Sequence, residues 1–465
     1  MFENFIRANS GRVQPFYDLM PAPARTLAAS ARGWLLTRNR YAPEMFDLLR
    51  GLRTHEKWSA DEVAHHQLQA LRRTVEWARR TVPFYKNCPQ LEWRSADELS
   101  ELPVLTRESV QRNGNRLISE SVPGNERIAV ATTGTTGASL QVSFSSAVAR
   151  RNWAFRMRQW AWAGLEPRAP RITLFGSRVV PPQRHQPPYW VYNIPERQTL
   201  MSIFHLSKQT APDYVGFLRQ HQDNILESFP SVLGILADFI LERGESIPMR
   251  VVFTDGEPLY PFLRSKIERA FKTSIFNSYG NTEFCGLIQE CECHRMHLAP
   301  EYAFLEVLDE NSRPVALGEE GFLVWTGFIN DVMPLIRYRI GDRGAWLKIQ
   351  SCPCGRAFPL VVPTITRESD LLRCPDGRIF SPRALNQVLK TATAFRFCQF
   401  VQTGPARVVV RAVPRNGKAS EDLLKVRSDL QELLGRGMEV VGELGEAPLT
   451  RAGGKIPLIV DQRKR

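Results

Sequence analysis

The sequence predicts an α/β protein in two parts: a large N-terminal domain, residues 1–368, and a small C-terminal α+β domain, residues 369–465. Apolar strand-like runs alternate with helical patterns across residues 128–340, which is typical of βαβ units in a layered core. After Asp370 the pattern changes to a compact alternation of short strands and helices. A chain of 465 residues is long enough for two or three domains.

The N-terminal lead-in, residues 1–90, is predicted to be helical. Pro15, Pro21 and Pro23 are expected to break its first part, because proline lacks the N–H that a helix interior needs. Residues 68–82 place apolar side chains at helical spacing and arginines on another face, which predicts an amphipathic helix.

The core elements are predicted from their apolar pattern. The expected strands are 172–175, 251–254, 274–276 and 322–326, and the expected helices are 212–221 and 260–271. Residues 306–348 are strand-rich, which predicts a small β subdomain. The C-terminal domain is expected to contain strands at 371–373 and 407–413, a turn at 375–377 and helices at 382–389 and 421–434.

The composition, 43% apolar and 23% charged, is that of a globular protein. No window approaches 18 uninterrupted apolar residues, so no spanning helix is expected. The first residues lack the layout of a signal peptide, so a cytoplasmic location is expected. There, eight cysteines are expected to act as thiols or metal ligands more than as disulfides.

The net charge of +13 is compatible with anionic cofactors, acidic lipid, acidic glycan or nucleic acid. The sequence holds no nucleic-acid motif, so no nucleic-acid partner is expected. Peripheral membrane contact is a hypothesis for the basic N-terminal helices, where Arg32, Arg38 and Arg40 surround Trp34. The alternative is a solvated basic face.

A loop rich in threonine and glycine follows the apolar run 128–131. It consists of Thr132, Thr133, Gly134, Thr135, Thr136 and Gly137. Glycine lets a backbone approach its ligand closely, and successive amides with hydroxyls beside them suit a polyphosphate. No lysine follows the second glycine, so the loop is not of the GxxxxGK[ST] type. Taken alone, it is equally compatible with a surface hairpin.

Five further fragments follow in order along the chain. They are Asp255-Gly256-Glu257-Pro258, Tyr279-Gly280-Asn281-Thr282-Glu283, residues 337–342, the pair Arg367 and Asp370, and Gly453-Gly454-Lys455. In this order and at these distances, the fragments closely resemble the core motifs of the adenylate-forming (ANL) superfamily. More narrowly, the chain resembles the phenylacetate–CoA ligase family, especially its capsular-polysaccharide (CapK-like) branch.

This resemblance implies an ATP-dependent, AMP-forming acid–CoA ligase. Such an enzyme joins a small-molecule carboxylate to the α-phosphate of ATP, releases pyrophosphate and then transfers the acyl group to CoA. Lys455 and Glu283 are then the catalytic residues: Lys455 bridges the carboxylate and the α-phosphate, and Glu283 holds Mg²⁺. The loop from Thr132 to Gly137 grips the triphosphate.

The resemblance also implies further contacts to the nucleotide, assigned to the residues that occupy the matching motif positions. Asp342 resembles the ribose-binding aspartate, and Arg367 is expected to add a ribose or phosphate contact. Residues expected along the adenine or completing the nucleotide site are Asp255, Gly256, Glu257, Tyr279, Gly280, Asn281 and Thr282. Asp370 is the expected hinge for a C-terminal lid that excludes water.

Two positions depart from the pattern of this family. Ala138 stands where most relatives have a lysine after the last glycine of the loop, and Thr366 stands where a glycine usually precedes the arginine. The first departure affects the grip on the β- and γ-phosphates, and the second affects the freedom of the hinge.

A second constellation combines cysteine and histidine between residues 291 and 354. It contains Cys291, Cys293, His294, His297, Cys352 and Cys354. Thiolates with imidazole suit Zn²⁺. The resemblance to the CapK-like branch implies that the ligands are Cys291, His297, Cys352 and Cys354, in a structural zinc site. Cys293 and His294 are competing ligands, and buried free thiols beside a surface histidine are the alternative.

The acid and the acceptor are left open by the sequence. The acyl pocket is expected between residues 153–162, 189–203 and 231–238. CoA is the first acceptor to consider. The alternatives are an adenylating acyl- or aminoacyltransferase that modifies a glycan precursor without free CoA, and an inactive ANL scaffold that binds anionic lipid or glycan.

Overall fold

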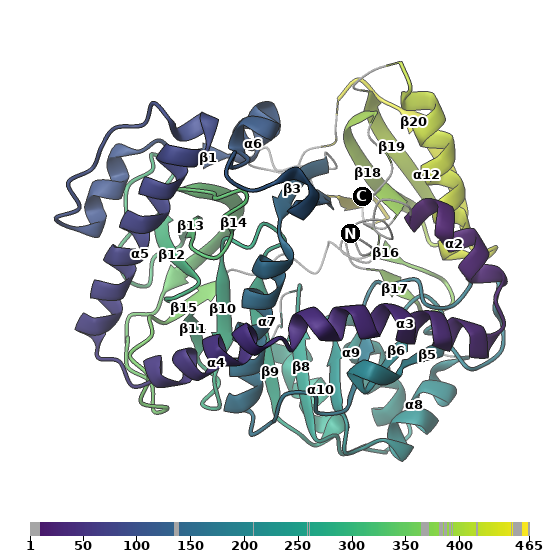
Figure 1. Cartoon of the computed structure of the whole chain (residues 1–465). Helices are drawn as coiled ribbons and strands as arrows, with labels where there is room; N and C mark the ends of the chain where they lie inside the picture. Colours follow the sequence, from purple (N-terminus) through teal and green to yellow (C-terminus); the bar gives the residue numbers. More distant parts are fainter. Residues whose placement is uncertain are drawn as a thin grey trace.

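The computed structural model shows an α/β body that carries a smaller α+β unit near the C-terminal end of the chain, so the predicted fold class is confirmed (Figure 1). The residues that the structure describes are 10–133, 139–207, 209–257, 259, 261–363, 372–380, 385, 388–389, 392, 394–414, 417–447, 449 and 458–463. Among these residues no helix combines the length and the apolar character needed to cross a bilayer.

The N-terminal part of the described chain begins with helices. They are α2 (Ser10–Leu19), α3 (Ala22–Arg40), α4 (Pro43–His55) and α5 (Ala60–Thr81), followed by the 3₁₀ turns η1 (Pro83–Tyr85) and η2 (Ala96–Glu101). A capping box starts α5: the Glu62 N–H donates to Ser59 Oγ at 3.2 Å, and the Ser59 N–H donates to Glu62 Oε2 at 2.7 Å.

The expectation that Pro15 breaks the first helix is wrong, because Pro15 lies inside α2. A proline removes one backbone hydrogen bond and crowds one carbonyl a turn earlier, and this ten-residue helix accommodates that loss in its middle. Pro21 and Pro23 do separate α2 from α3. Pro21 is the N-cap of α3, and Pro23 lies in its first turn, where the N–H would have no helical partner.

The larger of two mixed sheets has eight strands in the order β11-β10-β9-β8-β7-β4-β6-β5, and β9-β8-β7-β4-β6 run parallel. Its strands are β4 (Arg171–Leu174), β5 (Trp190–Asn193), β6 (Gln198–Met201), β7 (Ile225–Ser228), β8 (Val251–Asp255), β9 (Ile275–Gly280), β10 (Leu287–Glu290) and β11 (Met296–Leu298). The helices beside or between these strands in the chain are α7 (Ser146–Trp162), α8 (Ala211–Gln220), α9 (Pro230–Leu241) and α10 (Pro261–Phe271), and η5 (Ile194–Glu196) follows β5.

The second sheet has five strands in the order β1-β14-β13-β12, with β15 paired to β14. Its strands are β1 (Leu105–Thr106), β12 (Ala303–Leu308), β13 (Gly321–Gly327), β14 (Tyr338–Trp346) and β15 (Val361–Pro363). Between β1 and α7 the chain forms α6 (Arg107–Asn113), η3 (Gly114–Leu117), η4 (Gly124–Glu126) and the hairpin of β2 (Ile128–Thr133) and β3 (Ser139–Phe144).

The C-terminal unit contains a four-stranded sheet in the order β20-β19-β18-β21 and the two-stranded pair β16-β17. Its elements are β16 (Leu372–Arg373), β17 (Ile379–Phe380), β18 (Phe395–Gly404), β19 (Arg407–Pro414), α12 (Ala419–Leu434), β20 (Glu439–Leu444) and β21 (Ile459–Asp461). The expected helix at 382–389 lies largely outside the described residues.

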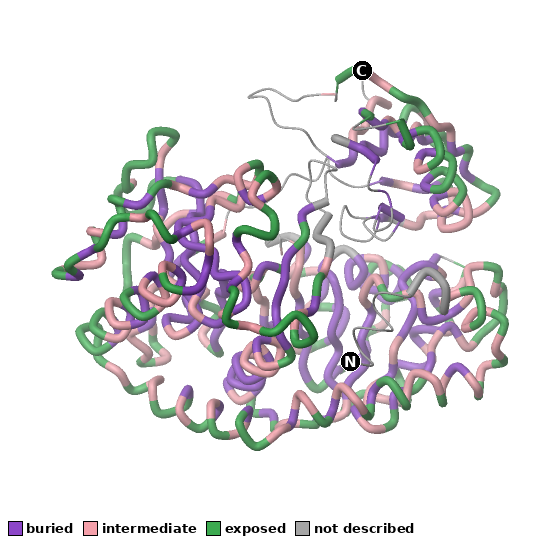
Figure 2. Tube along the Cα trace, turned by 45° about the horizontal axis from the view of Figure 1, so that its top comes forward, coloured by how far each residue is buried: buried purple, intermediate pink, exposed green. Residues whose placement is uncertain are grey.

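Polar contacts join the C-terminal unit to the body. Arg178 Nη2 lies 2.7 Å from Asp18 Oδ2 in α2 and 3.1 Å from Glu432 Oε1 in α12. Arg378 Nη1 donates to the Phe204 carbonyl at 3.4 Å. A large buried apolar cluster also continues from the helices of the larger sheet into the C-terminal sheet and α12. Buried segments follow the strands in both parts (Figure 2).

Candidate functional site

Two parallel strands end at the same edge of the larger sheet and carry two of the expected motifs. Asp255, the last residue of β8, pairs in register with Ser278 of β9. The carboxyl ends of parallel strands form the usual ligand site of an open α/β sheet. Asp255-Gly256-Glu257 and Tyr279–Glu283 therefore leave the sheet side by side. Gly256 has φ +74°, a left-handed turn that favours glycine.

A hydrogen bond connects this edge to the second sheet. The Tyr279 hydroxyl donates to Asp342 Oδ2 at 2.7 Å. Burial raises the pKa of Tyr279 well above its usual value, and the Asp342 carboxylate raises it further, so the hydroxyl keeps its proton. The Trp325 ring stacks on Tyr279 with centroids 5.9 Å apart. Tyr279 thus orients the aspartate expected to bind ribose.

Glu283 is a buried carboxylate next to this bridge, with 4% of its surface exposed. Burial raises the pKa of Glu283 above its usual value. Arg107 acts against this shift, and the nearby Asp342 carboxylate adds to it. A bound cation would favour the ionised form of such a carboxylate, so the environment fits the role of a magnesium ligand.

The turn that presents Glu283 is held in place by polar contacts. The Cys285 N–H donates to Asn281 Oδ1 at 2.9 Å, and Phe284 has φ +55°, which is uncommon for a bulky residue. Asn330 Nδ2 donates to the Glu283 carbonyl at 3.4 Å and to the Ser143 carbonyl at 3.1 Å. Because Ser143 belongs to β3, Asn330 ties the β2–β3 hairpin to the Glu283 turn.

The threonine- and glycine-rich loop connects the strands of this hairpin. Thr132 and Thr133 end β2, and Thr133 pairs with Ser139 at the start of β3. The rest of the loop, Gly134 to Gly137, lies outside the described residues, as does Ala138. The predicted residues Arg367, Asp370 and Lys455, and the departure at Thr366, also lie outside them.

Arg107 is a residue of this site that the sequence analysis missed. It is the first residue of α6, and its charge opposes the burial effect on Glu283. A signal existed in the sequence, since a helix N-terminus favours acidic side chains and a cation there is unfavourable unless it has another partner. Only the fold shows that the partner is a carboxylate far along the chain.

A small pocket opens beside Asp255. Its lining residues are Arg156, Gln159, Trp160, Phe175, Phe253, Thr254, Asp255 and Ser278. Arg156 lies 2.5 Å from Glu227 and 3.8 Å from Asp255. Burial by itself would lower the pKa of Arg156, but Glu227 and Asp255 outweigh it and raise the pKa. Among described residues, only the first of the three segments expected to line the acyl pocket contributes to this one.

The four expected zinc ligands lie together. Two come from the β10–β11 hairpin of the larger sheet and two from the segment between β14 and β15. The ligand atoms of Cys291, His297, Cys352 and Cys354 all lie within 4.8 Å of one another. Cys291 Sγ is 3.7 Å from Cys352 Sγ, and Cys354 Sγ is 3.4 Å from His297 Nε2. Tetrahedral zinc places two sulfurs about 3.8 Å apart and a sulfur and a nitrogen about 3.6 Å apart. The donor set therefore fits Zn²⁺.

The groups around this cluster determine which of the nearby side chains can bind a metal ion. His297 Nδ1 is 3.0 Å from the Phe358 carbonyl, so a proton on Nδ1 is donated there and Nε2 faces the thiols. Burial lowers the pKa of His297 to about 4, so the imidazole is neutral. Cys293 is not part of the cluster, and His294 instead contacts Glu290 at 3.2 Å.

Comparisons with known proteins agree with the motif order. Protein CapK of Staphylococcus aureus is 22% identical over 427 residues, covering 88% of this chain and 90% of CapK. A phenylacetate–coenzyme A ligase of Pseudomonas putida is 24% identical over 357 residues, covering 72% of this chain and 77% of that ligase. No family model matches the sequence.

Solved structures show the same fold. A 2-hydroxyisobutyryl-CoA ligase, in complex with 2-HIB-AMP and CoA in its thioesterification state, has a TM-score of 0.56 at 19% identity. The match covers 88% of this chain and 91% of that structure. The chain therefore has the fold of that CoA ligase. These relatives confirm the resemblance read from the motifs: the chain is similar in sequence to CapK and to phenylacetate–CoA ligases.

Proposed function

We propose that this protein activates a carboxylic acid with ATP, releases pyrophosphate and transfers the acyl group to CoA. The observation that carries the proposal is the bridge from Tyr279 to Asp342 beside buried Glu283. These residues come from two sheets and meet where the family motifs require a nucleotide. The similar protein of Pseudomonas putida and the similar solved structure are both named as CoA ligases.

The site residues that the structure describes each have a definite role in this proposal. Asp342, oriented by Tyr279, accepts hydrogen bonds from the ribose hydroxyls. Glu283 holds Mg²⁺, which neutralises phosphate charge when bound, and Arg107 favours the ionised carboxylate against the larger effect of burial. Asp255, Gly256 and Glu257 lie along the adenine, where the turn at Gly256 exposes backbone groups.

The threonine- and glycine-rich loop, together with residues outside the described part, completes the proposed reaction. Thr132 to Gly137 cradle the triphosphate with amides and hydroxyls. Lys455 bridges the carboxylate and the α-phosphate as negative charge grows there, and Arg367 contacts the nucleotide. Asp370 is the hinge of the C-terminal domain, residues 369–465, which closes over the site and keeps water from the acyl-adenylate.

We propose that the acid enters the pocket beside Asp255. Trp160, Phe175 and Phe253 supply apolar walls, while Arg156 and Asp255 supply charge at the rim. Such a mixed lining suits a short acid that carries a polar substituent more than a long alkyl chain, because an alkyl chain would remove water from the charged side chains without offering them a hydrogen bond.

We further propose a structural zinc ion held by Cys291, His297, Cys352 and Cys354, with no coordination position left for substrate. A glycan hydroxyl or amine is the alternative acceptor. A cytoplasmic location agrees with eight free cysteines. Peripheral membrane contact through the N-terminal helices is also proposed, and α3 supplies its surface.

The decisive experiment measures ATP- and Mg²⁺-dependent pyrophosphate release over a panel of hydroxy, amino, aromatic and aliphatic acids. Hydroxylamine traps the acyl-adenylate, and CoA or a glycan acceptor is then added to find the second substrate. Lys455→Ala is the control and is expected to lower release about 10²–10³-fold. Absence of release and of ATP binding across the panel would leave only an inactive scaffold that binds anionic lipid or glycan.

A further inference from the structure

Helix α3 has an unusual distribution of polar and apolar side chains. A surface helix normally turns its apolar stripe toward the protein and its polar face toward water. In α3, the side that contacts the larger sheet is small or polar. It is made by Thr26, Ser30, Gly33 and Thr37. The exposed side instead carries Leu27, Ala31 and Trp34.

The inward contacts show that this orientation is built into the fold. Ser30 Oγ donates to the Tyr192 carbonyl at 3.3 Å and accepts from the Ile194 N–H at 3.2 Å. Thr37 Oγ1 donates to Glu196 Oε1 at 3.0 Å. A Cβ at Gly33 would lie 1.7 Å from Asn193 Oδ1, so only glycine allows this close approach. The helix therefore cannot rotate to bury its apolar side.

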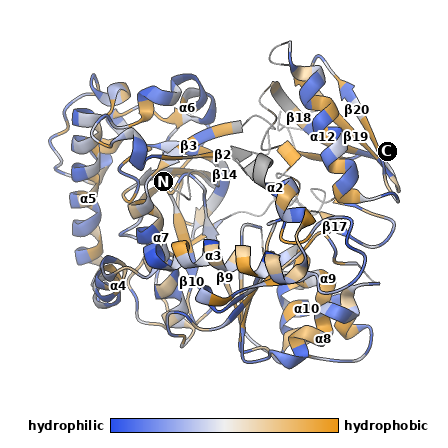
Figure 3. Ribbon diagram, turned by 45° about the vertical axis from the view of Figure 1, so that its right-hand side comes forward, coloured by the Kyte–Doolittle hydropathy of each residue, from blue (hydrophilic) through white to orange (hydrophobic). Residues whose placement is uncertain are grey.

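The exposed apolar surface is substantial and continues onto the neighbouring edge strand. Leu27 is 68% exposed and Trp34 is 52% exposed. Tyr192 of β5 and Ile194 just after it are 44% and 66% exposed. We call the outward side of α3 with these two residues the α3 face. Figure 3 shows hydrophobic segments along α3 on the outside of the body.

The charge around the α3 face is positive. Arg32, Arg38 and Arg197 are exposed there, and the Arg38 guanidinium lies 4.9 Å from the centroid of the Trp34 ring. The sequence from residue 19 to residue 43 contains no acidic side chain. In segment 183–197 the single acid is Glu196, which is fully buried with Arg171.

We propose that the α3 face binds the surface of an anionic phospholipid bilayer, with the helix lying in the interface. Tryptophan and leucine enter the boundary between headgroups and acyl chains, and arginines reach the phosphates with their apolar stems along the helix. Positive charge without nearby acid selects anionic lipid over zwitterionic lipid. The ligand is the lipid surface, and the nucleotide site takes no part in the binding.

The test is co-sedimentation of the full-length protein with vesicles of phosphatidylcholine, with or without phosphatidylglycerol. Binding is expected only with phosphatidylglycerol and should weaken with salt. The double variant Leu27→Ser with Trp34→Ser is expected to bind the vesicles at least about tenfold more weakly than wild type. Arg38→Gln is expected to bind about fivefold more weakly.

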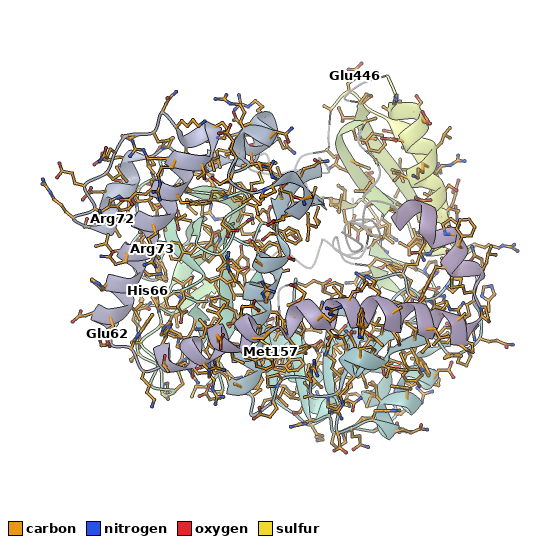
Figure 4. The ribbon with its side chains drawn as sticks, viewed as in Figure 1. Glu62, His66, Arg72, Arg73, Met157 and Glu446 are labelled. Atoms are coloured by element: carbon orange, nitrogen blue, oxygen red, sulfur yellow. The ribbon has the colours of Figure 1, made fainter. Side chains whose placement is uncertain are left out.

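Matched controls use exposed residues elsewhere on the molecule. Ile349→Ser with Leu424→Ser removes two apolar side chains that are 71% and 61% exposed, and Arg72→Gln with Arg73→Gln removes charge from α5 (Figure 4). Both doubles should bind like wild type. Melting temperature and pyrophosphate release should be unchanged in every variant, which shows that the fold survives.

Several outcomes would overturn the proposal. They are wild-type protein that ignores anionic vesicles, control doubles that lose binding equally, and binding that is the same without phosphatidylglycerol. A size in solution that falls when Leu27 and Trp34 are replaced would instead identify the α3 face as an interface between two copies. Binding that appears only after removal of residues 1–9 would mean that this segment covers the face.

Discussion

The acid cluster of Tyr279, Glu283 and Asp342 and the thiol cluster around Cys291 and His297 differ in how complete they are. In the acid cluster, two carboxylates lie near each other, Glu283 in the turn after β9 and Asp342 within β14, and Asp342 is exposed. In the thiol cluster, four soft ligands already lie within 4.8 Å of one another, and a backbone carbonyl holds the imidazole.

This difference indicates different roles for two charged or metal-binding centres in one body. The acid cluster sets two carboxylates against the charge of one arginine, Arg107, so its free energy changes most when Mg²⁺ and a nucleotide arrive. The thiol cluster can satisfy one ion completely, so its free energy contributes to folding. Substitutions in the first should therefore change activity, and those in the second should change stability.

The largest expected effect is that of Glu283→Gln on the reaction. Loss of the carboxylate removes the magnesium ligand, so pyrophosphate release should fall about a hundredfold or more. The melting temperature should stay the same or rise, because a buried carboxylate with a raised pKa is itself costly. Exposed Glu310→Gln is the matched control and should retain activity. A large drop in melting temperature with Glu283→Gln would contradict the separation of roles.

Cys352→Ser should act on stability. Loss of one thiolate from a closed site is expected to lower the free energy of unfolding by about 3 kcal/mol and the melting temperature by about 3 °C. Zinc content by mass spectrometry should fall with it. Cys293→Ser, a neighbouring thiol outside the cluster, should change neither. Purified protein without stoichiometric zinc, together with unchanged melting of Cys352→Ser, would refute the metal site.

The pH dependence should separate function from stability at Glu283. Because burial raises its pKa, kcat/KM should fall as pH is lowered through that raised pKa, by up to about tenfold per pH unit. The folded state binds this proton more tightly than the unfolded chain, so Glu283's contribution to stability falls as pH rises through the same window. Both trends should be absent in Glu283→Gln; a wild-type profile identical to that of the variant would sink this assignment.

The smallest effect is expected for Tyr279→Phe, which removes only the hydrogen bond to Asp342. A single hydrogen bond of this kind is worth about 1–2 kcal/mol, so KM for ATP should rise about five- to thirtyfold with little change in kcat. Tyr192→Phe, an exposed tyrosine on β5, is the control. If kcat falls as much as in Glu283→Gln, then Tyr279 does more than orient Asp342.

Local pattern was sufficient to predict much of the framework. The strand expected at 251–254 is β8, Val251–Asp255, and the helix expected at 260–271 is α10, Pro261–Phe271. Apolar residues recur at a regular spacing where one face of an element is buried, and both of these elements contribute buried residues to the core. The prediction failed at Pro15, where the backbone accommodates one missing bond inside α2.

The candidate sites were predictable only as far as their residue types allowed. Thiols and imidazole at close spacing indicate a metal, but only the fold separates Cys291 and His297 from Cys293 and His294. Arg107 was missed, because an electrostatic partner 176 positions away leaves no local pattern. The sequence indicated Trp34 as a candidate for membrane contact, but it did not predict the exposure of Leu27, since a helical apolar stripe is expected to face inward.

By itself, the sequence determined the order of the motifs, the alternation of strands and helices, and the kinds of side chain available for chemistry. These are local properties, set by backbone propensity and by the functional groups themselves. The tertiary structure alone decided that Tyr279 would meet Asp342 across two sheets and that α3 would present its apolar side to solvent. Such decisions depend on long-range packing and on the burial of charge, which no stretch of sequence contains.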